Sequence, residues 1–311
     1  MKLAMVFPGQ GSQAVGMMKA YAGLPGIERV LGEAAEVLGA EFLKLLDEGP
    51  AESLNLTINT QPAMVAVGYA AYTAWLALGG PQPEVVAGHS LGEYTALVAT
   101  GAIAFRDCLP LVRFRAQAMQ EAVPEGQGAM AAILNLDDDN VREACADASQ
   151  GEIVQAVNFN APGQVVIAGH RAAVSRAIEA CKARGAKRAM PLPVSAPFHS
   201  SLMQPAAERL RGYLEKLNMR SPSVPLINNV DVALPQDPAA IKESLVRQAA
   251  SPVRWAEIIR RMAEMGVTHV FECGPGKVLT GLVKRIDGSL QAASLTDRGS
   301  IEQALASLKG A

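Results

Sequence analysis

A serine between two glycines is the residue of this sequence best placed to act as a nucleophile. Ser90 lies in Gly88-His89-Ser90-Leu91-Gly92, which fits the pattern G-x-S-x-G between an apolar run and a helical pattern that stops at Gly101. In that setting a strained turn exposes the hydroxyl, and the free N–H groups of the helix start can stabilise an oxyanion. The segment therefore predicts covalent catalysis through Ser90, with a turn used only for packing as the alternative.

A serine hydroxyl is a weak nucleophile until a base takes its proton. The chain offers four histidines for this role: His89, His170, His199 and His269. His89 shares the turn with Ser90 and must point elsewhere, while His170 and His269 lie beside or within strand-like segments. His199 ends a proline-broken loop ahead of a helix, and such loops place catalytic groups. Position alone favours His199 as the base and leaves the other histidines open.

One helical segment, at 107–121, carries a single charge on its apolar face. Arg115 shares this face with Cys108, Leu111, Val112, Ala118, Met119 and Ala122. Arg113 lies about 200° around the helix from it, so both cannot point inward. A buried guanidinium needs an anionic partner, and its planar fork suits a carboxylate. That partner is either a carboxylated substrate or an internal Asp or Glu.

Two further glycine-rich segments do not fit the motifs of a nucleotide-binding site. The loop at 7–13 resembles a dinucleotide pattern, but Pro8 interrupts it. The segment at 273–277 lacks the first glycine of a phosphate-binding loop, because Phe271 stands there. We expect the second segment to be a turn, and the first to lie where a second oxyanion donor would be found.

Alternating strands and helices must position these residues. In the first part of the chain, apolar patterns predict strands at 3–7 and 84–87 and helices at 26–46, 61–78 and 107–121. This order indicates a parallel sheet covered by helices. Later segments resume it, with helices at 203–217, 241–249, 253–265 and after Asp297, and strands at 224–228 and 267–272.

The middle of the chain has a different order. After a break rich in proline and glycine, strand, helix, strand, strand, helix and strand are predicted at 129–134, 138–148, 153–159, 164–168, 172–184 and 188–192, with a turn at 160–163. This β-α-β-β-α-β order is the ferredoxin-like unit. We predict an α/β protein with a large domain at 1–124 and 197–311 and a small inserted subdomain at 125–196.

Composition excludes several classes of protein. Of the 311 residues 50% are hydrophobic, and the net charge of −2 gives no reason to expect nucleic-acid or membrane binding. Neither a signal peptide nor an apolar stretch of membrane-spanning length is found, so we expect a cytoplasmic protein. The cysteines, which show no C-x-x-C spacing and lie in apolar segments, are expected to be free and buried, with no metal site: Cys108, Cys145, Cys181 and Cys273.

With these motifs in view, the chain resembles malonyl-CoA:acyl carrier protein transacylases over nearly its whole length. The segments that carry the resemblance are FPGQGSQ at 7–13, GHSLGEY at 88–94, RFRAQAMQ at 113–120, NFNAPGQVVIAG at 158–169, SAPFHSSLM at 195–203, RQAASPVRW at 247–255 and ECGPGKVL at 272–279. Each is weak alone, but together they are specific. The resemblance implies an α/β-hydrolase-like large domain with a ferredoxin-like subdomain and the active site between them.

The resemblance also implies roles for single residues. Ser90 would be the nucleophile and His199 the base, with Gln10 and Leu91 donating backbone N–H groups to the oxyanion. Arg115 would bind the malonyl carboxylate. The other matched positions are Gln248, whose backbone carbonyl would orient the histidine, Asn160 beside the pocket, and Phe198, whose bulk would limit the acyl group. Met119 is a further expected substrate-binding residue.

The implied reaction moves a malonyl group from malonyl-CoA to the phosphopantetheine thiol of acyl carrier protein through malonyl-Ser90, for fatty acid synthesis. It would use no cofactor, and we expect a monomer. A basic cluster is the expected docking site for the acidic carrier protein: Lys182, Arg184, Lys187 and Arg188. A polyketide-type acyltransferase, a carrier-protein-binding subunit without activity, and a hydrolase remain as alternatives. The hydrolase would use Ser90, then Asp231 or Asp237, then His269 in that chain order.

Overall fold

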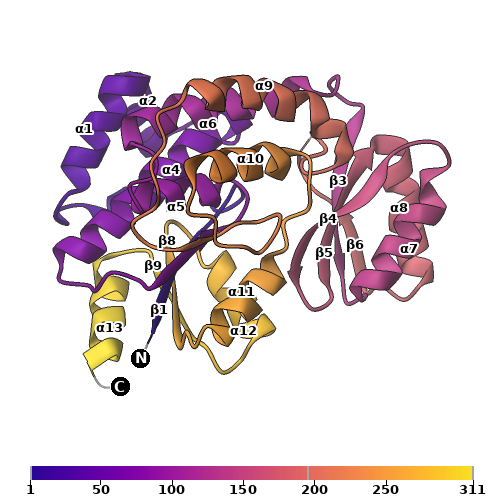
Figure 1. The fold of residues 1–311 in the computed structure, drawn as a ribbon. Coiled ribbons are helices and arrows are strands. Elements are labelled where there is room, and N and C mark those ends of the chain that lie inside the picture. The colour runs from indigo at the N-terminus through magenta and orange to yellow at the C-terminus, as the bar shows by residue number, and fades with distance from the viewer. Residues whose placement is uncertain (1, 195, 310–311) are drawn as a thin grey trace.

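Two separate sheets organise the protein in a computed structural model, which describes residues 2–194 and 196–309. The larger sheet has five strands in the order β7-β2-β1-β8-β9, all paired in parallel. The strands are β1 (Leu3–Phe7), β2 (Val85–Gly88), β7 (Leu226–Ile227), β8 (His269–Cys273) and β9 (Gln291–Leu295). Figure 1 shows this sheet on the left of the molecule, with the smaller sheet on the right.

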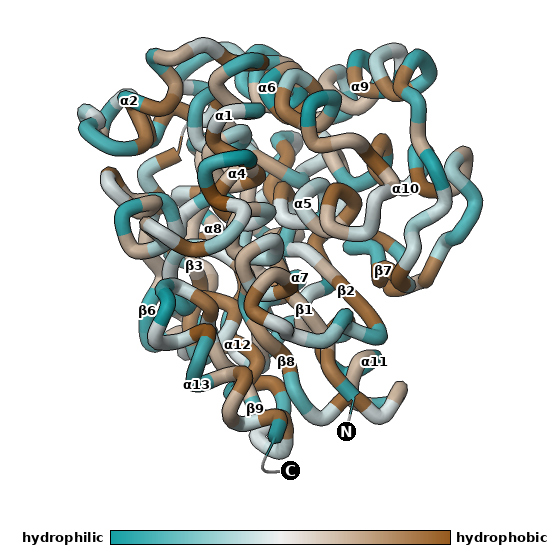
Figure 2. The backbone as a smooth tube through the Cα atoms, turned by 90° about the vertical axis from the view of Figure 1, so that its left-hand side faces the viewer, coloured by the Kyte–Doolittle hydropathy of each residue, from teal (hydrophilic) through white to brown (hydrophobic). Residues whose placement is uncertain are grey.

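Helices bury both faces of the large sheet. In β1, Leu3, Met5 and Phe7 belong to one hydrophobic cluster, and Ala4 and Val6 to another on the opposite face. Continuous apolar runs of this kind are typical of parallel strands covered on both sides, and the central strands are accordingly hydrophobic in Figure 2.

The first cluster includes residues of α1 (Ile27–Leu38), α2 (Ala40–Glu48), α3 (Ala51–Leu54), α4 (Thr57–Ala77), α5 (Gly92–Ala99), α6 (Phe105–Glu121), α9 (Gln204–Lys216), α10 (Pro238–Ala249) and α13 (Arg298–Lys309). The second includes residues of α11 (Trp255–Glu264) and α12 (Val278–Ile286).

The second sheet confirms the predicted β-α-β-β-α-β order. Its strands run β4-β5-β3-β6 and all pairs are antiparallel. The elements are β3 (Gly128–Leu134), α7 (Asp138–Ser149), β4 (Val154–Ala161), β5 (Gln164–His170), α8 (Arg171–Ala183) and β6 (Arg188–Pro191). One face packs on α7 and α8, and the other presents Met130, Val157, Val166 and Ala168 toward Phe198. The limits of the two domains, at 124–125 and 196–197, stay a prediction.

Strand β4 joins the two parts of the protein. Val253, in the loop after α10, donates its N–H to Val157 O at 2.8 Å and accepts from Phe159 N at 3.0 Å. Gln155 Oε1 accepts from Ser201 N at 2.8 Å, just after the loop that carries His199. The small subdomain is therefore attached to the segments that follow two of the predicted site residues.

Several predicted boundaries were wrong. The turn predicted at 160–163 is shorter, because β4 continues through a register shift to Ala161 and leaves Pro162 and Gly163 to reverse the chain. Helix α4 begins at Thr57, ahead of Pro62, in a turn whose polar residues lack apolar periodicity. Strand β7 has only two residues, and α12 and β9 were not predicted at all.

Candidate active site

A strained turn after β2 presents Ser90. Its φ of 52° lies in the left-handed region, which costs free energy for a residue other than glycine. A Cβ on Gly88 would lie 1.8 Å from Gly92 C, and one on Gly92 would lie 2.0 Å from Phe7 O, so both positions require glycine. Asn229 holds the turn by accepting from Ser90 N and donating to Gly88 O, each at 2.7 Å.

A histidine lies within hydrogen-bond reach of this serine. Ser90 Oγ is 2.7 Å from His199 Nε2, and His199 Nδ1 is 2.8 Å from the backbone oxygen of Gln248. Because a carbonyl oxygen only accepts, Nδ1 carries the proton and Nε2 is free to take one. Burial and the nearby charge of Arg115 lower the pKa of His199 to about 3, so the ring is neutral at physiological pH.

The other histidines are placed away from the serine hydroxyl. His89 points to Asn160, with Nε2 2.7 Å from Oδ1, and His170 Nδ1 accepts from a backbone N–H of the small subdomain. His269 pairs with Leu3 at the first residue of β8, whereas Ser90 follows the last residue of β2. The two therefore lie at opposite ends of the parallel strands, His269 at the N-terminal end and Ser90 beyond the C-terminal end.

The acids of the hydrolase alternative are engaged elsewhere. Asp231 accepts two hydrogen bonds from the guanidinium of Arg247, and Asp237 caps the start of α10. With His269 at the opposite end of the strands from Ser90, no Ser-Asp-His arrangement forms in that chain order. The hydrolase triad is therefore wrong.

Arg115 is buried, as its place on the apolar face predicts, while Arg113 is exposed. Its Nη1 donates to Gln61 Oε1 at 3.0 Å, and its Nη2 donates to Gln248 Oε1 at 2.9 Å and to Ser90 Oγ at 3.3 Å. Nε has no partner, and no Asp or Glu of the described residues lies at ion-pair distance. The internal ion pair is therefore absent within these residues. Burial lowers the pKa of the guanidinium.

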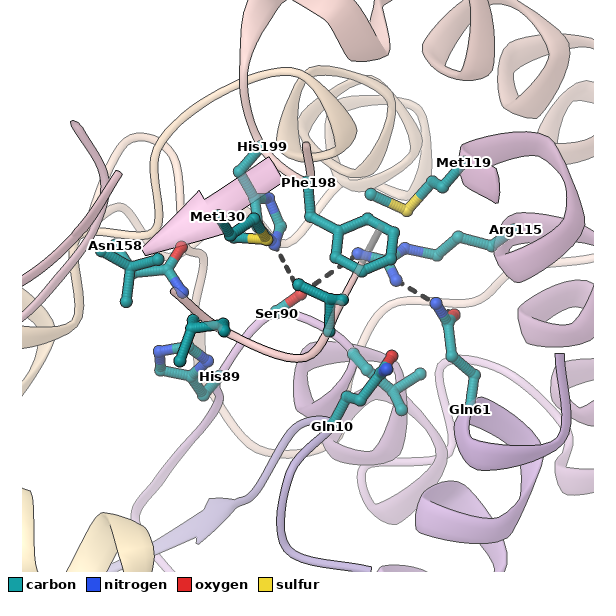
Figure 3. Close-up of a pocket in the computed structure, with 14 residues that line it drawn as sticks. Gln10, Gln61, His89, Ser90, Arg115, Met119, Met130, Asn158, Phe198 and His199 are labelled. Carbon is teal, nitrogen blue, oxygen red and sulfur yellow. Dashed lines mark hydrogen bonds between the residues drawn. The ribbon is translucent and has the colours of Figure 1, made fainter. Parts of the chain in front are cut away.

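Ser90, His199 and Arg115 line one cavity of about 130 Å³, drawn in Figure 3. Its apolar wall includes Met119 and Phe198, together with Met130, Val166, Leu192 and Val194. Asn160 lies outside this lining, bonded to His89, whereas Asn158 is part of it. Both asparagines lie within β4.

Two backbone N–H groups lie near Ser90 at the cavity. Gln10 and Leu91 both line the cavity, and neither backbone N–H donates to another of the described residues. Gln10 follows the C-terminal end of β1 and Leu91 directly precedes α5, whose dipole adds positive potential there. The pair can therefore bind an oxyanion formed on an acyl group attached to Ser90.

Three buried polar residues near the site were not identified from the sequence. Gln61 and Asn229 contact Arg115 and Ser90 as described above, and Glu93 accepts from Gln248 Nε2 at 2.9 Å. A polar residue inside an otherwise apolar helix was the available signal for Gln61 and Glu93. Asn229 follows a strand too short to be recognised by its pattern.

The described part of the chain contains neither a metal site nor a membrane helix. Within residues 2–194 and 196–309, no cluster of His, Cys, Asp and Glu side chains is arranged to hold a metal ion. No helix in these same residues combines the length and hydropathy that crossing a membrane requires. The four cysteines are free and buried, as predicted.

Comparison with known proteins places the chain in a family. Residues 4–296 match the family model described as the acyl transferase domain. The malonyl CoA-acyl carrier protein transacylase of Escherichia coli K12 is 52% identical over 305 residues, covering 98% of this chain and 99% of that protein.

Solved structures agree over the same length. The acyl-carrier-protein S-malonyltransferase of Burkholderia pseudomallei 1710b has a TM-score of 0.97 at 62% identity, covering 98% of this chain and all (100%) of that one. A malonyl-transacylase solved in complex with its type II PKS acyl-carrier protein has a TM-score of 0.97 at 50% identity, covering 99% and 100%. The chain therefore belongs to the acyl transferase family, among the malonyl CoA-acyl carrier protein transacylases.

Proposed function

We propose that this enzyme transfers the malonyl group of malonyl-CoA to the phosphopantetheine thiol of acyl carrier protein. One observation carries the proposal: Arg115 is buried without an ionic partner among the described residues and donates to Ser90 Oγ at 3.3 Å. A cation at this distance from a nucleophile suits an acyl group with a second carboxylate a few bonds from its carbonyl. Malonyl is the short acyl group of that kind that the family's names indicate.

The first half-reaction forms an acyl-enzyme. His199 Nε2 takes the proton of Ser90 as Oγ attacks the thioester carbonyl of malonyl-CoA. The tetrahedral oxyanion is held by the backbone N–H groups of Gln10 and Leu91. When the C–S bond breaks, the proton on His199 passes to the coenzyme A sulfur, and malonyl-Ser90 remains.

The second half-reaction repeats these steps with another thiol. The phosphopantetheine sulfur of the carrier protein gives its proton to His199 and attacks the ester carbonyl, and Ser90 leaves as the alcohol. Oxygen and sulfur exchange the acyl group without any redox change. The reaction therefore calls for no cofactor beyond the group that the carrier protein brings.

The base is oriented without an acid. His199 donates from Nδ1 to the carbonyl oxygen of Gln248 at 2.8 Å, so the tautomer is fixed by a neutral group. A neutral partner stabilises the imidazolium less than a carboxylate would, which agrees with the strongly lowered pKa of His199. The imidazole ring is therefore unprotonated at neutral pH, and its Nε2 can accept the proton of Ser90.

The cavity explains the choice of acyl group. An acetyl group has no carboxylate and would leave Arg115 unpaired. Acetyl is therefore disfavoured, because an unpaired buried charge costs several kcal/mol of free energy. Phe198 and Met119 close the apolar side of the small cavity and would oppose a branch on the acyl α-carbon. We infer that Gln61 and Gln248 hold the guanidinium in place for the carboxylate.

Acyl carrier protein is the proposed partner, as in the solved complex of a related transacylase. Of the four cations predicted to dock it, Lys182 pairs with Glu179, and Arg184 pairs with Asp147. Lys187 and Arg188 are exposed and make no ion pair within the described residues, so we propose these two for docking. We further propose a cytoplasmic monomer that supplies fatty acid synthesis.

The proposed function is tested by following where the malonyl group goes. The enzyme is incubated with radiolabelled malonyl-CoA, with and without carrier protein that bears phosphopantetheine. We expect label on the carrier protein and little free malonate in its absence. Rapid release of free malonate without carrier protein would support a hydrolase instead, and label transfer from acetyl-CoA as fast as from malonyl-CoA would contradict the role of Arg115.

A further inference from the structure

A buried carboxyl group beside the site has no part in the reaction steps above. Glu93 lies in the first turn of α5 and is 1% exposed. Burial raises its pKa to about 7, which reflects the free-energy cost of holding a charge there. An apolar side chain would avoid that cost, so the contacts of Glu93 indicate what the carboxyl contributes.

One contact leads to the arginine and the base. Glu93 Oε2 accepts from Gln248 Nε2 at 2.9 Å, and Gln248 Oε1 accepts from Arg115 Nη2 at 2.9 Å. When ionised, the carboxyl group only accepts, as does the backbone oxygen of Ser90, to which Gln248 Nε2 also donates at 2.9 Å. These two acceptors together fix which end of the amide faces the guanidinium. Turned over, the amide would place its N–H donors against the N–H donors of Arg115. The same residue, Gln248, also orients His199 through its backbone oxygen.

The other contact leads to the nucleophile. Glu93 Oε2 also accepts from Asn229 N at 3.0 Å. The side chain of Asn229 accepts from Ser90 N and donates to Gly88 O, so it holds both sides of the turn. A single oxygen thus joins two segments that lie 136 and 155 residues away from Glu93 in the sequence.

We propose that Glu93 is a positioning residue, which orients Arg115 through Gln248 and holds the Ser90 turn through Asn229. The inference rests on the proposed function, because selectivity for a carboxylated acyl group is its readout. A residue needed only for folding would lower the activity with every acyl group equally. A residue that aims Arg115 lowers malonyl transfer more than acetyl transfer.

The experiment measures acyl-enzyme formation from malonyl-CoA and from acetyl-CoA in two variants. Glu93→Leu removes the acceptor, and we expect the ratio of malonyl to acetyl rates to fall about tenfold. Glu93→Gln keeps an oxygen acceptor at the same position, so its ratio should stay within about twofold of the wild-type ratio. An unchanged ratio in Glu93→Leu overturns the proposal.

Glu272 provides the matched control. It is equally buried and also accepts from backbone N–H groups, those of Leu279 and Thr280 at the start of α12. Glu272→Leu should lower the melting temperature and leave the malonyl-to-acetyl ratio unchanged. If it lowers the ratio as much as Glu93→Leu does, loss of stability explains both effects and the proposal fails.

A double variant tests whether Glu93 acts through Gln248. The ratio in Glu93→Leu/Gln248→Leu should equal that of Gln248→Leu alone, and losses that multiply would contradict the route. Should Glu93→Leu not fold, Glu93→Gln decides, since a tenfold loss of ratio with the acceptor retained overturns the proposal. Absence of a malonyl adduct on the wild-type enzyme would instead refute the proposed function.

Discussion

The two parts of the molecule contribute differently to the cavity. The large domain supplies every group that would exchange a proton or bind a charge, from Ser90 and His199 to Arg115. The small subdomain supplies mainly apolar wall, such as Met130 and Val166. Side chains of the first kind are held by buried hydrogen bonds, whereas those of the wall make apolar contacts. Substitutions of the polar groups should therefore alter the rate of acyl transfer, and substitutions in the apolar wall should alter the affinity for the substrate.

The largest effect is expected from the nucleophile. Ser90→Ala removes the atom that we propose carries the acyl group, so the transfer rate should fall by at least about 10⁴-fold. The measurement is the rate of malonyl transfer to carrier protein, with the melting temperature as a control for folding. A variant that retained a tenth of the activity would contradict covalent catalysis at this residue.

Arg115→Ala should change the rates of malonyl-enzyme and acetyl-enzyme formation in opposite directions. Loss of the guanidinium is expected to lower malonyl-enzyme formation about 100-fold or more, because the substrate carboxylate is then buried unpaired. Acetyl-enzyme formation should rise. Arg113→Ala, on the exposed side of the same helix, is the matched control and should change neither rate. Equal losses with both acyl groups would show a structural role for Arg115.

The pH dependence tests the lowered pKa of His199. A base with the ordinary pKa of 6.5 would be about nine-tenths protonated at pH 5.5, and the acylation rate would fall about tenfold from its value at pH 7.5. With a pKa of about 3 the ring stays neutral, so we expect a fall of less than about threefold. Single-turnover acylation at a series of pH values measures this. Burial raises the pKa of Glu93 to about 7, within the same pH range, so Glu93→Gln is measured alongside. A tenfold fall that persists in this variant contradicts the assignment.

The lowered pKa of His199 also makes the stability of the protein depend on pH. As the pH falls from 6.5 towards 3, the unfolded chain protonates His199 while the folded protein does not. The unfolded state therefore binds more protons, and this residue lowers the free energy of unfolding as the pH falls through that window.

The smallest effect is expected from the apolar wall. Met130→Ala removes packing surface that contributes equally to ground state and transition state, so KM for malonyl-CoA should rise about fivefold with kcat unchanged. Steady-state kinetics with intact carrier protein measure both constants. A fall in kcat larger than the rise in KM would show that the small subdomain takes part in the chemistry.

Local patterns explain how much of this could be predicted from sequence. The turn around Ser90 and the buried face of Arg115 are set by residues within a few positions of each other, and both predictions agree with the structure. The β-α-β-β-α-β order was predicted for the same reason. By contrast, the contacts of Gln61, Glu93 and Asn229 join residues 54 to 155 positions apart, and no local pattern encodes them. Short or partly exposed elements such as β7 and β9 also lack a readable period.

The central claim is that Ser90 carries the malonyl group between two thiols. The most direct measurement is intact-mass analysis of the wild-type enzyme shortly after mixing with malonyl-CoA and before any carrier protein is added, followed by peptide mapping. We predict one malonyl group per chain, located on Ser90 and lost when carrier protein bearing phosphopantetheine is added. A protein that transfers malonyl without an adduct, or with the adduct on another residue, would contradict the account.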